Sequence, residues 1–221
     1  MLDRIGPAHA SAPMAFLSDV HGNLAALEAV VAELQRRTIS DIFVAGDLLL
    51  GGDEPLEVWR RLAQLNARCT RGASDVALAT VDPRRLEAKS DSERAMLERF
   101  AKTRAAVGEV VLRRLGALPQ QLRLPMVDGR ELLMVHGSPG DPLESMSHDL
   151  EEEELAALLD DDPADIVVCG GSHVPFERPV LDAQLINVGS VGEAPEGRVA
   201  HYTVISPRVD GAIVEQTWVE Y

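Results

Sequence analysis

The sequence has few aromatic residues, no excess of basic charge and no long apolar run. Aromatic side chains make up only 4% of the 221 residues, so we expect a core built mainly from Leu, Val, Ile and Ala. The formal net charge of −15 argues against non-specific binding to nucleic acids, because that requires a basic surface. No apolar run approaches the length of a membrane span, so we expect no membrane-embedded segment.

There are also only two cysteines, Cys69 and Cys169, and each lies within or at the end of an apolar stretch. The N-terminal region does not contain the basic segment followed by an apolar one that marks a secretory signal. We therefore expect a cytoplasmic protein whose two cysteines are reduced, buried thiols. Residues 1–13 lack hydrophobic periodicity and are predicted to form a loose leader, and residues 14–221 are predicted to form a single domain.

In the first half of the chain, short apolar runs alternate with amphipathic segments of helical periodicity. The runs at 14–18, 42–45 and 67–70 are predicted to be buried strands. Helices are predicted between them at 24–37 and 55–65. Repetition of strand, polar loop and helix predicts parallel strands with helices packed on their faces.

Residues 84–118 form a different region, which is predicted to be helical and rich in charge. We interpret it as a pair of solvated helices. A minority of its basic residues could reach over a functional site as a cap.

The second half of the chain is predicted to be rich in hairpins. Asp128-Gly129 is a strong turn signal between two apolar runs, and Asp210-Gly211 predicts a terminal hairpin. An acidic helix is expected to be capped by Ser147 or Asp149 and to run through Leu159. Further strands are predicted at 166–169 and 185–188. The predicted fold class is therefore α/β, one domain with a parallel half and a hairpin-rich half.

Aspartate or histidine side chains follow five of these expected strand ends, nearly always beside a glycine. They are Asp19 and His21, Asp47, Asp75, His136, and His173. In open α/β sheets the functional site lies at the carboxyl ends of the strands, so we expect these side chains to lie together. A mixed set of carboxylate and imidazole ligands suits Mn, Fe, Zn or Ni.

Each of these residues also has a structural interpretation. A single histidine at a strand end is more often a hydrogen-bonded residue than a ligand, and an aspartate there is commonly a helix cap, as Asp19 could be. Gly-Asp after a strand is ordinary turn chemistry. This interpretation does not explain why the same residue types recur at five strand ends, so the set as a whole favours a metal site.

Five short motifs carry a family resemblance: SDVHGN, AGDLL, RGASD, VHGSP and GGSHVPF, in that order. With them, residues 14–220 resemble the calcineurin-like metallophosphoesterases, and in particular small bacterial phosphodiesterases and diadenosine-tetraphosphatase-like proteins. The resemblance implies a β-sandwich flanked by helices, with a metal site at the carboxyl-terminal ends of the strands. It also implies one or two divalent transition metals per chain, Mn, Fe, Zn or Ni.

The family's motifs assign the metal ligands residue by residue. The ligand positions of the first metal are Asp19, His21, Asp47 and His173, and all four are present. The second metal shares Asp47 and adds His136. Its two other positions hold Ala73 in place of Asn and Gly171 in place of His. The resemblance thus implies an intact first metal site and an atypical or absent second one.

If a second metal binds, other groups must replace the missing ligands. Candidate substitutes near the altered motifs are Ser74, Asp75, His148 and Ser172. In a second interpretation the first site alone activates water. In a third, the chain is a catalytically degenerate homologue that binds a nucleotide or a partner as a regulatory protein. Four intact ligands favour an active enzyme, because a buried carboxylate cluster is costly without a cation.

The family reaction is attack on phosphorus by a metal-bound hydroxide. The resemblance makes Asp47 and His136 catalytic and puts Ser74 at the position of the residue that assists the leaving group. A serine hydroxyl cannot supply a proton near neutral pH as an imidazole can. We therefore expect phosphodiesters or phosphoanhydrides with good leaving groups as substrates, rather than simple alkyl phosphomonoesters.

Asn23 and Arg71 lie beside the ligands in the sequence and are candidate contacts for the phosphate oxygens of a substrate. The alternative for Arg71 is a surface ion pair. Asn187 and Gly189 are expected to shape a loop near the site. The expected partner is a small phosphate ester, in one interpretation a nucleotide, and a homo-oligomer is compatible with the sequence.

Overall fold

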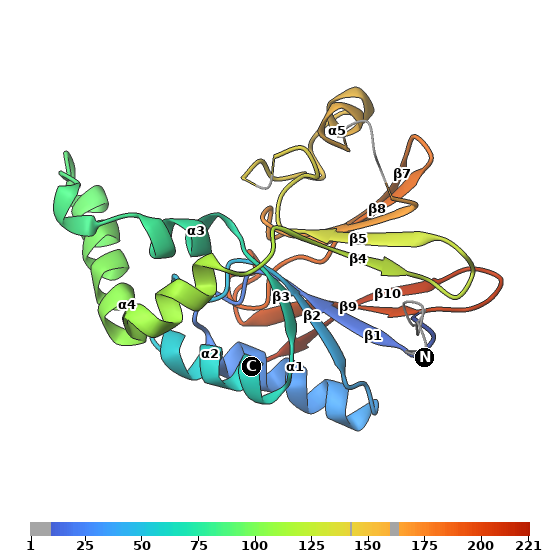
Figure 1. The fold of residues 1–221 in the computed structure, drawn as a ribbon, viewed down its shortest axis with the longest axis horizontal. Helices are drawn as coiled ribbons and strands as arrows, with labels where there is room; N and C mark the ends of the chain where they lie inside the picture. The colour runs from blue at the N-terminus through green and yellow to red at the C-terminus, as the bar shows by residue number, and fades with distance from the viewer. Residues whose placement is uncertain (1–9, 142, 160–163) are drawn as a thin grey trace, which may run out of the picture.

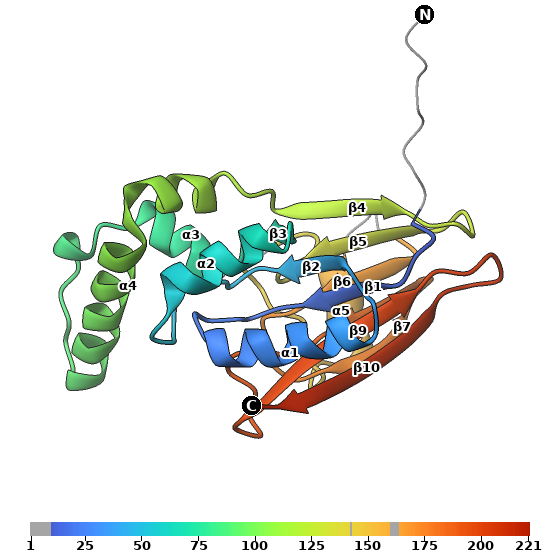
Figure 2. The ribbon, with the colours of Figure 1, turned by 90° about the horizontal axis from the view of Figure 1, so that it is seen from below.

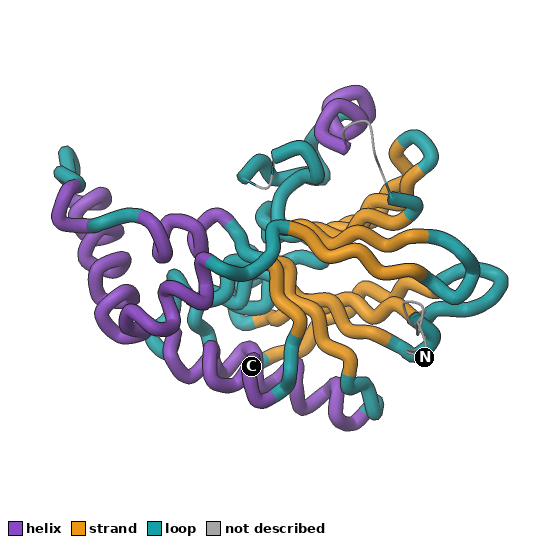
Figure 3. The backbone as a smooth tube through the Cα atoms, in the orientation of Figure 1, coloured by secondary structure: helices purple, strands orange, loops and turns teal. Residues whose placement is uncertain are grey.

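A computed structural model of the protein describes residues 10–141, 143–159 and 164–221 (Figure 1). Two five-stranded sheets pack face to face, and helices cover their outer faces. Figure 3 shows the strands gathered in the two layers and the helices grouped at one end and along the outside. This confirms the predicted class α/β and the helix-flanked β-sandwich that the family resemblance implies.

The first sheet has the strand order β10–β9–β1–β2–β3. Its strands are β1 (Met14–Leu17), β2 (Asp41–Ala45), β3 (Arg68–Thr70), β9 (Val199–Ser206) and β10 (Ile213–Glu220). β1, β2 and β3 are parallel, as predicted from the strand–helix alternation. β9 is antiparallel to β1 and forms the predicted terminal hairpin with β10.

The second sheet has the order β4–β5–β6–β8–β7. Its strands are β4 (Gln121–Pro125), β5 (Glu131–Val135), β6 (Ile166–Cys169), β7 (Phe176–Val180) and β8 (Ala183–Asn187). β5, β6 and β8 are parallel, and β4 and β7 are antiparallel edge strands. The hairpin predicted from Asp128-Gly129 is confirmed as β4–β5.

The helices lie on the outside of the sandwich. They are α1 (Leu24–Arg36), α2 (Pro55–Gln64), α3 (Ala73–Thr80), a 3₁₀ turn at Pro83–Arg85, α4 (Asp91–Gly116) and α5 (Glu152–Leu159). Figure 2 shows α1 and α2 lying along the first sheet, while α3 and α4 project beyond the strand ends. Within the described part of the chain, no helix is long and apolar enough to cross a membrane.

The central strands are buried on both faces, which explains why they appear as continuous apolar runs rather than as alternating ones. On β1, Met14 and Phe16 point into the layer between the sheets, whereas Ala15 and Leu17 pack toward the helices. Phe16 stacks on Phe43 of β2 with ring centroids 4.9 Å apart. Apart from this aromatic pair, the layer between the sheets is largely aliphatic, as expected.

The helical region agrees with the predicted pair of helices. α4 spans Asp91–Gly116, but two helical segments meet within it at a kink at Gly108, whose φ of 73° and ψ of 165° are not helical. Glycine adopts a positive φ without steric cost, so the chain can change direction there. α3 and β7 were not predicted from the sequence.

The acidic helix α5 begins later than predicted. Its first residue is Glu152, so the proposed caps Ser147 and Asp149 were wrong. The Glu154 carboxylate instead accepts a hydrogen bond from the Glu151 N–H at 2.9 Å, and acidic residues fill the first turn as predicted.

At the N-terminal side, Ala10 pairs with the β4–β5 hairpin. Its N–H donates to the Pro125 carbonyl at 2.9 Å, and its own carbonyl accepts from the Val127 N–H at 3.2 Å. Residues 1–9 of the predicted loose leader lie outside the described residues.

The two cysteines are free thiols, and we expect both to be unreactive in the native protein. Burial raises the pKa of Cys69 to about 12 and also raises the pKa of Cys169, which is fully buried. Only a thiolate attacks a disulfide reagent. At pH 8, 5,5′-dithiobis(2-nitrobenzoate) should therefore label the native chain at least about 100-fold more slowly than the chain unfolded in guanidinium chloride.

The variants Cys69→Ala and Cys169→Ala assign each slow phase to one thiol. Rapid labelling of two thiols in the native chain would contradict the burial of both groups.

Candidate metal centre

The five predicted ligands follow four strands at one end of the sandwich. Asp19 and His21 follow β1, Asp47 follows β2, His136 follows β5 and His173 lies in the loop after β6. β1 is parallel to β2, and β5 is parallel to β6, so each pair of loops emerges side by side. In Figure 1 the turns of the β4–β5 and β9–β10 hairpins lie at the opposite end of the molecule from α3 and α4.

Backbone hydrogen bonds tie these loops to one another across the two sheets. The Gly170 N–H donates to the His136 carbonyl at 2.9 Å, and the Asp19 N–H donates to the Gly46 carbonyl at 3.1 Å. The Gly192 N–H, from the segment between β8 and β9, donates to the Asp19 carbonyl at 2.9 Å. The ligand side chains are therefore carried by a connected backbone framework.

The first group of ligand atoms comes from Asp19, His21 and His173. His173 Nε2 lies 3.1 Å from Asp19 Oδ1 and 3.2 Å from His21 Nε2, and His21 Nε2 lies 3.5 Å from Asp19 Oδ1. Ligand atoms bonded at about 2.1 Å to one ion lie about 3.0 to 3.4 Å apart. These three atoms therefore have the spacing that a shared metal ion requires.

Asp47 links this group to a second one. Its Oδ2 lies 4.0 Å from His21 Nε2, and its Oδ1 lies 3.5 Å from His136 Nε2. Asp19, Asp47 and His136 each place one ligand atom within 4.8 Å of the others. The Asp47 carboxylate thus has one oxygen toward each group, as expected of a bridging ligand.

The three histidines share a second feature that favours metal binding. Each Nδ1 atom faces a backbone carbonyl. The distance is 2.6 Å from His21 to Leu50, 2.7 Å from His136 to Ala45, and 3.1 Å from His173 to Glu193. An Nδ1–H that donates to a carbonyl leaves Nε2 as the free lone pair, which is how metal-binding histidines are oriented. Each Nε2 points to an aspartate of the cluster.

The backbone at these positions is unusual. Seven described residues other than glycine have positive φ, and four of them are predicted ligands: Asp19 at 54°, His21 at 49°, Asp47 at 52° and His173 at 63°. Such conformations cost energy and concentrate at functional sites. The positive φ angles at these four residues accompany the convergence of their side chains on one cluster of ligand atoms.

The comparisons with known proteins agree with this geometry. Residues 13–209 match the calcineurin-like phosphoesterase superfamily domain. The chain belongs to this superfamily. Its members bind divalent metals and act on small phosphate esters, and the candidate ligands of this chain lie at the expected strand ends.

Several known proteins are similar to this chain. It is 26% identical over 209 residues to uncharacterized protein MJ0912 of Methanocaldococcus jannaschii, covering 83% of this chain and 78% of that protein. Hypothetical protein PH1004 from Pyrococcus horikoshii OT3 has a TM-score of 0.78 at 22% identity, over 95% of this chain and 88% of that one. A metallophosphoesterase from Sphaerobacter thermophilus has a TM-score of 0.73 at 24% identity, over 96% and 89%. These structures confirm the fold.

The main charged group of the candidate metal site is Asp19, which is fully buried. Burial by itself raises the pKa of this carboxyl, but His173 and His21 together outweigh it and hold the pKa of Asp19 well below its usual range. Burial lowers the pKa of His21, yet Asp19, with smaller contributions from Glu193 and Asp47, raises it to about 9. The two imidazoles therefore compensate a carboxylate that stays ionised.

The two predicted substrate contacts, Asn23 and Arg71, make hydrogen bonds within the fold. Asn23 is the N-cap of α1: its Oδ1 accepts from the Ala26 N–H at 3.1 Å, and its Nδ2 donates to the Gly192 carbonyl and the Tyr221 hydroxyl. Arg71 donates to the carbonyl of Gly116 at 2.8 Å, at the end of α4. This contact with a backbone carbonyl differs from the surface ion pair that was the alternative for Arg71. It also means that the guanidinium is not free of contacts within the protein.

Ser74 and Asp75 lie in the first turn of α3. The Ser74 N–H donates to Asp47 Oδ1 at 2.9 Å, and the Ser74 Oγ is buried without a hydrogen-bond partner in the described chain. Both carboxylate oxygens of Asp75 accept backbone N–H groups, of Leu48 at 3.1 Å and Gly72 at 3.0 Å. Burial and the nearby Asp47 charge raise the pKa of Asp75 to about 7.

The two remaining candidate substitutes are occupied elsewhere. His148 is half-exposed and pairs with its neighbour Asp149 at 2.9 Å. The Ser172 hydroxyl donates to the Val174 carbonyl at 3.4 Å. His148 belongs to neither of the two groups of His, Cys, Asp and Glu ligand atoms found in the described residues.

The segment of Asn187 and Gly189 does shape the site, as predicted. Asn187 Nδ2 donates to the Gly170 carbonyl at 2.8 Å and to the Met146 carbonyl at 3.1 Å, and its Oδ1 accepts from the Gly189 N–H. This buried side chain holds the loop after β6 against the loop after β5.

Sequence reasoning missed Glu193. Its Oε2 lies 3.9 Å from His21 Nε2, and its carbonyl accepts from His173. The signal was present in the sequence NVGSVGE, since the resemblance already included the first six of these residues and Glu193 is the next one. Glu193 adds a half-exposed negative charge at the rim of the first group.

The raised pKa of His21 predicts a pH dependence of metal binding. Below pH 9 the imidazole of the metal-free protein is protonated, and a metal ion must displace that proton from Nε2. Affinity should therefore rise with pH, by about tenfold per unit for each proton displaced. Titration calorimetry with Mn²⁺ at pH 6.5, 7.5 and 8.5, in buffers of different ionisation enthalpy, measures both the affinity and the proton release.

His201→Gln serves as the control, because His201 pairs with Glu196 outside the site. It should keep the same pH slope. An affinity that does not change between pH 6.5 and 8.5 would contradict the protonated state of His21.

Proposed function

We propose that the chain is a metal-dependent phosphoesterase that hydrolyses phosphodiester or phosphoanhydride bonds with good leaving groups. The observation that supports this most directly is the orientation of His21, His136 and His173. Each directs Nε2 to an aspartate and Nδ1 to a backbone carbonyl. A cluster kept only for structural stability would not need three imidazoles fixed in the same way.

In this proposal the residues divide into two sets around Asp47. Asp19, His21 and His173 would hold the first ion, and His136 belongs to the second position. When bound, divalent ions lower the pKa of water and neutralise negative charge on phosphate oxygens. The Ser74 N–H, which donates to Asp47 Oδ1, fixes the carboxylate that faces both sets. A Cβ at Gly72 would collide with the same oxygen, so glycine there leaves room for the bridging carboxylate.

Ser74 supports the preference for good leaving groups. Its hydroxyl would stand where other members of the family place a residue that can protonate the leaving oxygen. A serine hydroxyl has no accessible proton to give near neutral pH, although it can donate a hydrogen bond. Departure of an alkoxide would then be unassisted, whereas a phenolate or a phosphate leaves without help.

Two cavities beside the site supply surfaces for the rest of the substrate. One, of about 430 Å³, lies between Gly51-Gly52 and α4. Its charged lining residues are Arg99, Glu98, Asp53 and Lys102, and Lys102 pairs with Asp53 at 3.3 Å. The other, of about 370 Å³, is apolar and is lined in part by Leu50, Met96 and Phe100. The Leu50 carbonyl accepts from His21, so both cavities adjoin the metal-binding loop. A phosphate ester with an aromatic or nucleoside group fits this combination.

The competing function is that of a catalytically degenerate homologue that binds a nucleotide or acts as a regulator. Ala73 and Gly171 favour it, because two ligand positions of the second metal carry no donor side chain. The two functions differ in one measurable property, metal-dependent turnover. A nucleotide substrate, a cytoplasmic location and a homo-oligomeric state stay predictions.

The substitution Asp47→Asn tests the proposed reaction. Loss of the carboxylate that faces both sets should lower Mn²⁺-dependent hydrolysis of bis(p-nitrophenyl) phosphate at least about 100-fold. Asp82→Asn is the matched control, since Asp82 is held by Arg84 on the surface and should keep the wild-type rate. A wild-type chain that binds Mn²⁺ but shows no such rate would be a regulator rather than an enzyme.

The substitution Ser74→His tests the leaving-group argument separately. An imidazole at this position can act as a general acid, so hydrolysis of alkyl esters such as glycerol phosphate should rise at least about tenfold. The rate with bis(p-nitrophenyl) phosphate should change little, because its leaving group needs no proton. Efficient turnover of glycerol phosphate by the wild-type chain would refute the assignment of Ser74.

A further inference from the structure

The space next to Gly171 is filled by the side chain of another loop. A Cβ at Gly171 would lie 2.5 Å from Ser145 Oγ and 3.5 Å from His136 Nε2. A side chain at position 171 would therefore project into the place that the Ser145 hydroxyl occupies, beside the metal-binding nitrogen of His136. The two atoms are no more than about 6 Å apart, since both distances start from the same point.

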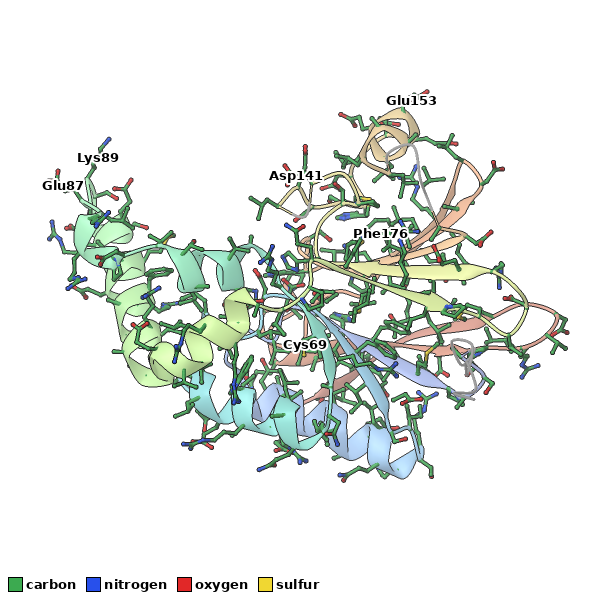
Figure 4. All side chains as sticks on the ribbon, viewed as in Figure 1. Cys69, Glu87, Lys89, Asp141, Glu153 and Phe176 are labelled. Carbon is green, nitrogen blue, oxygen red and sulfur yellow. The ribbon has the colours of Figure 1, made fainter. Side chains whose placement is uncertain are left out.

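The loop that carries Ser145 is held against the site. It follows β5 and lies above the strand ends, where Figure 4 labels its residue Asp141. The next residue, Met146, is fully buried, and its carbonyl accepts from Asn187 Nδ2, which also donates to the Gly170 carbonyl. Ser145 is thus fixed relative to Gly171 by a shared buried amide.

Ser145 itself is uncommitted. It is only partly buried, and its hydroxyl makes no hydrogen bond with another described residue. Three of the other candidate substitutes are engaged: Asp75 with two backbone N–H groups, Ser172 with the Val174 carbonyl and His148 with Asp149. The fourth, Ser74, also has a hydroxyl without a partner in the described chain, but it follows Ala73, the other altered position. Ser145 is the side chain that occupies the space beside Gly171.

We propose that Ser145 Oγ replaces the missing imidazole at position 171 as a donor to the second metal position, together with Asp47 and His136. This inference rests on the metal centre proposed above. A serine hydroxyl is a known ligand of Mg²⁺ in proteins, and it is harder and weaker than an imidazole toward transition metals. The second position should therefore be weaker than the first, and its preference for Zn²⁺ over Mn²⁺ should be smaller than at the first position.

Removal of the hydroxyl should act on one metal position only. In Ser145→Ala, the second Mn²⁺ dissociation constant from titration calorimetry should rise at least about tenfold, while the first changes less than about twofold. Ser147→Ala is the matched control in the same loop, because its Oγ accepts the Asp149 N–H instead. It should leave both constants unchanged.

A second variant gives a direct signature that does not depend on affinity. In Ser145→Cys, Co²⁺ at the second position should show a thiolate-to-cobalt charge-transfer band, which wild type and Ser147→Cys should lack. Cys69 and Cys169 are present in all three proteins, so their contribution cancels in the comparison.

Each result tests either the role of Ser145 or the proposed phosphoesterase function. A second constant unchanged in Ser145→Ala, or two bound Co²⁺ ions without the band in Ser145→Cys, overturns the role of Ser145 and leaves the first metal position intact. A wild-type chain that binds one ion also overturns it. A chain that binds no ion overturns the proposed phosphoesterase function as well, so the two failures are distinguishable.

Discussion

Two carboxylates, Asp19 and Asp47, are buried at the end of the sandwich with imidazoles as their ion-pair partners. Burial of an ionised carboxylate is costly unless a cation and hydrogen bonds compensate it. In each described ion pair of these two aspartates the partner is a histidine, whose Nε2 is also a metal ligand when neutral. The two buried carboxylates therefore require positive charge nearby. Protons on the histidines or divalent ions bound at Nε2 can both supply it.

The rest of the fold serves to hold this cluster in place. Parallel pairing brings the loops after β1 and β2 together, and likewise those after β5 and β6, so that side chains distant in sequence converge. The left-handed backbone at four of the ligands and the close approach of Gly72 to Asp47 are local costs of that convergence. The well-packed layers of β1 and β2 supply the stability that offsets them. Strain of this kind persists only where the surrounding structure fixes it.

Much of this was readable from the sequence because its signals are local. Apolar runs located the central strands, and an Asp or His after each run identified Asp19, His21, Asp47, His136 and His173. What escaped prediction depends on contacts between distant segments. The sequence around Ser145 is ordinary loop sequence, and only the packing against Gly171 gives it meaning. Arg71 and Asn23 looked like free polar groups, yet the carbonyls and hydroxyl that engage them come from the end of α4, the loop before β9 and the C-terminal Tyr221.

The altered positions 171 and 74 change the chemistry of the site in the same way. At Gly171 the family resemblance implies an imidazole, and a hydroxyl oxygen from Ser145 lies in that space; at Ser74 it implies a proton-donating side chain, and a hydroxyl is present instead. Both changes exchange a group with accessible acid–base chemistry for one that only hydrogen-bonds or coordinates through oxygen. Oxygen donors favour harder ions, and an absent acid favours leaving groups that depart unaided. In the proposed function, the departures from the family pattern point to a narrower chemistry built on the same first metal site, because all the predicted ligands of that site are present.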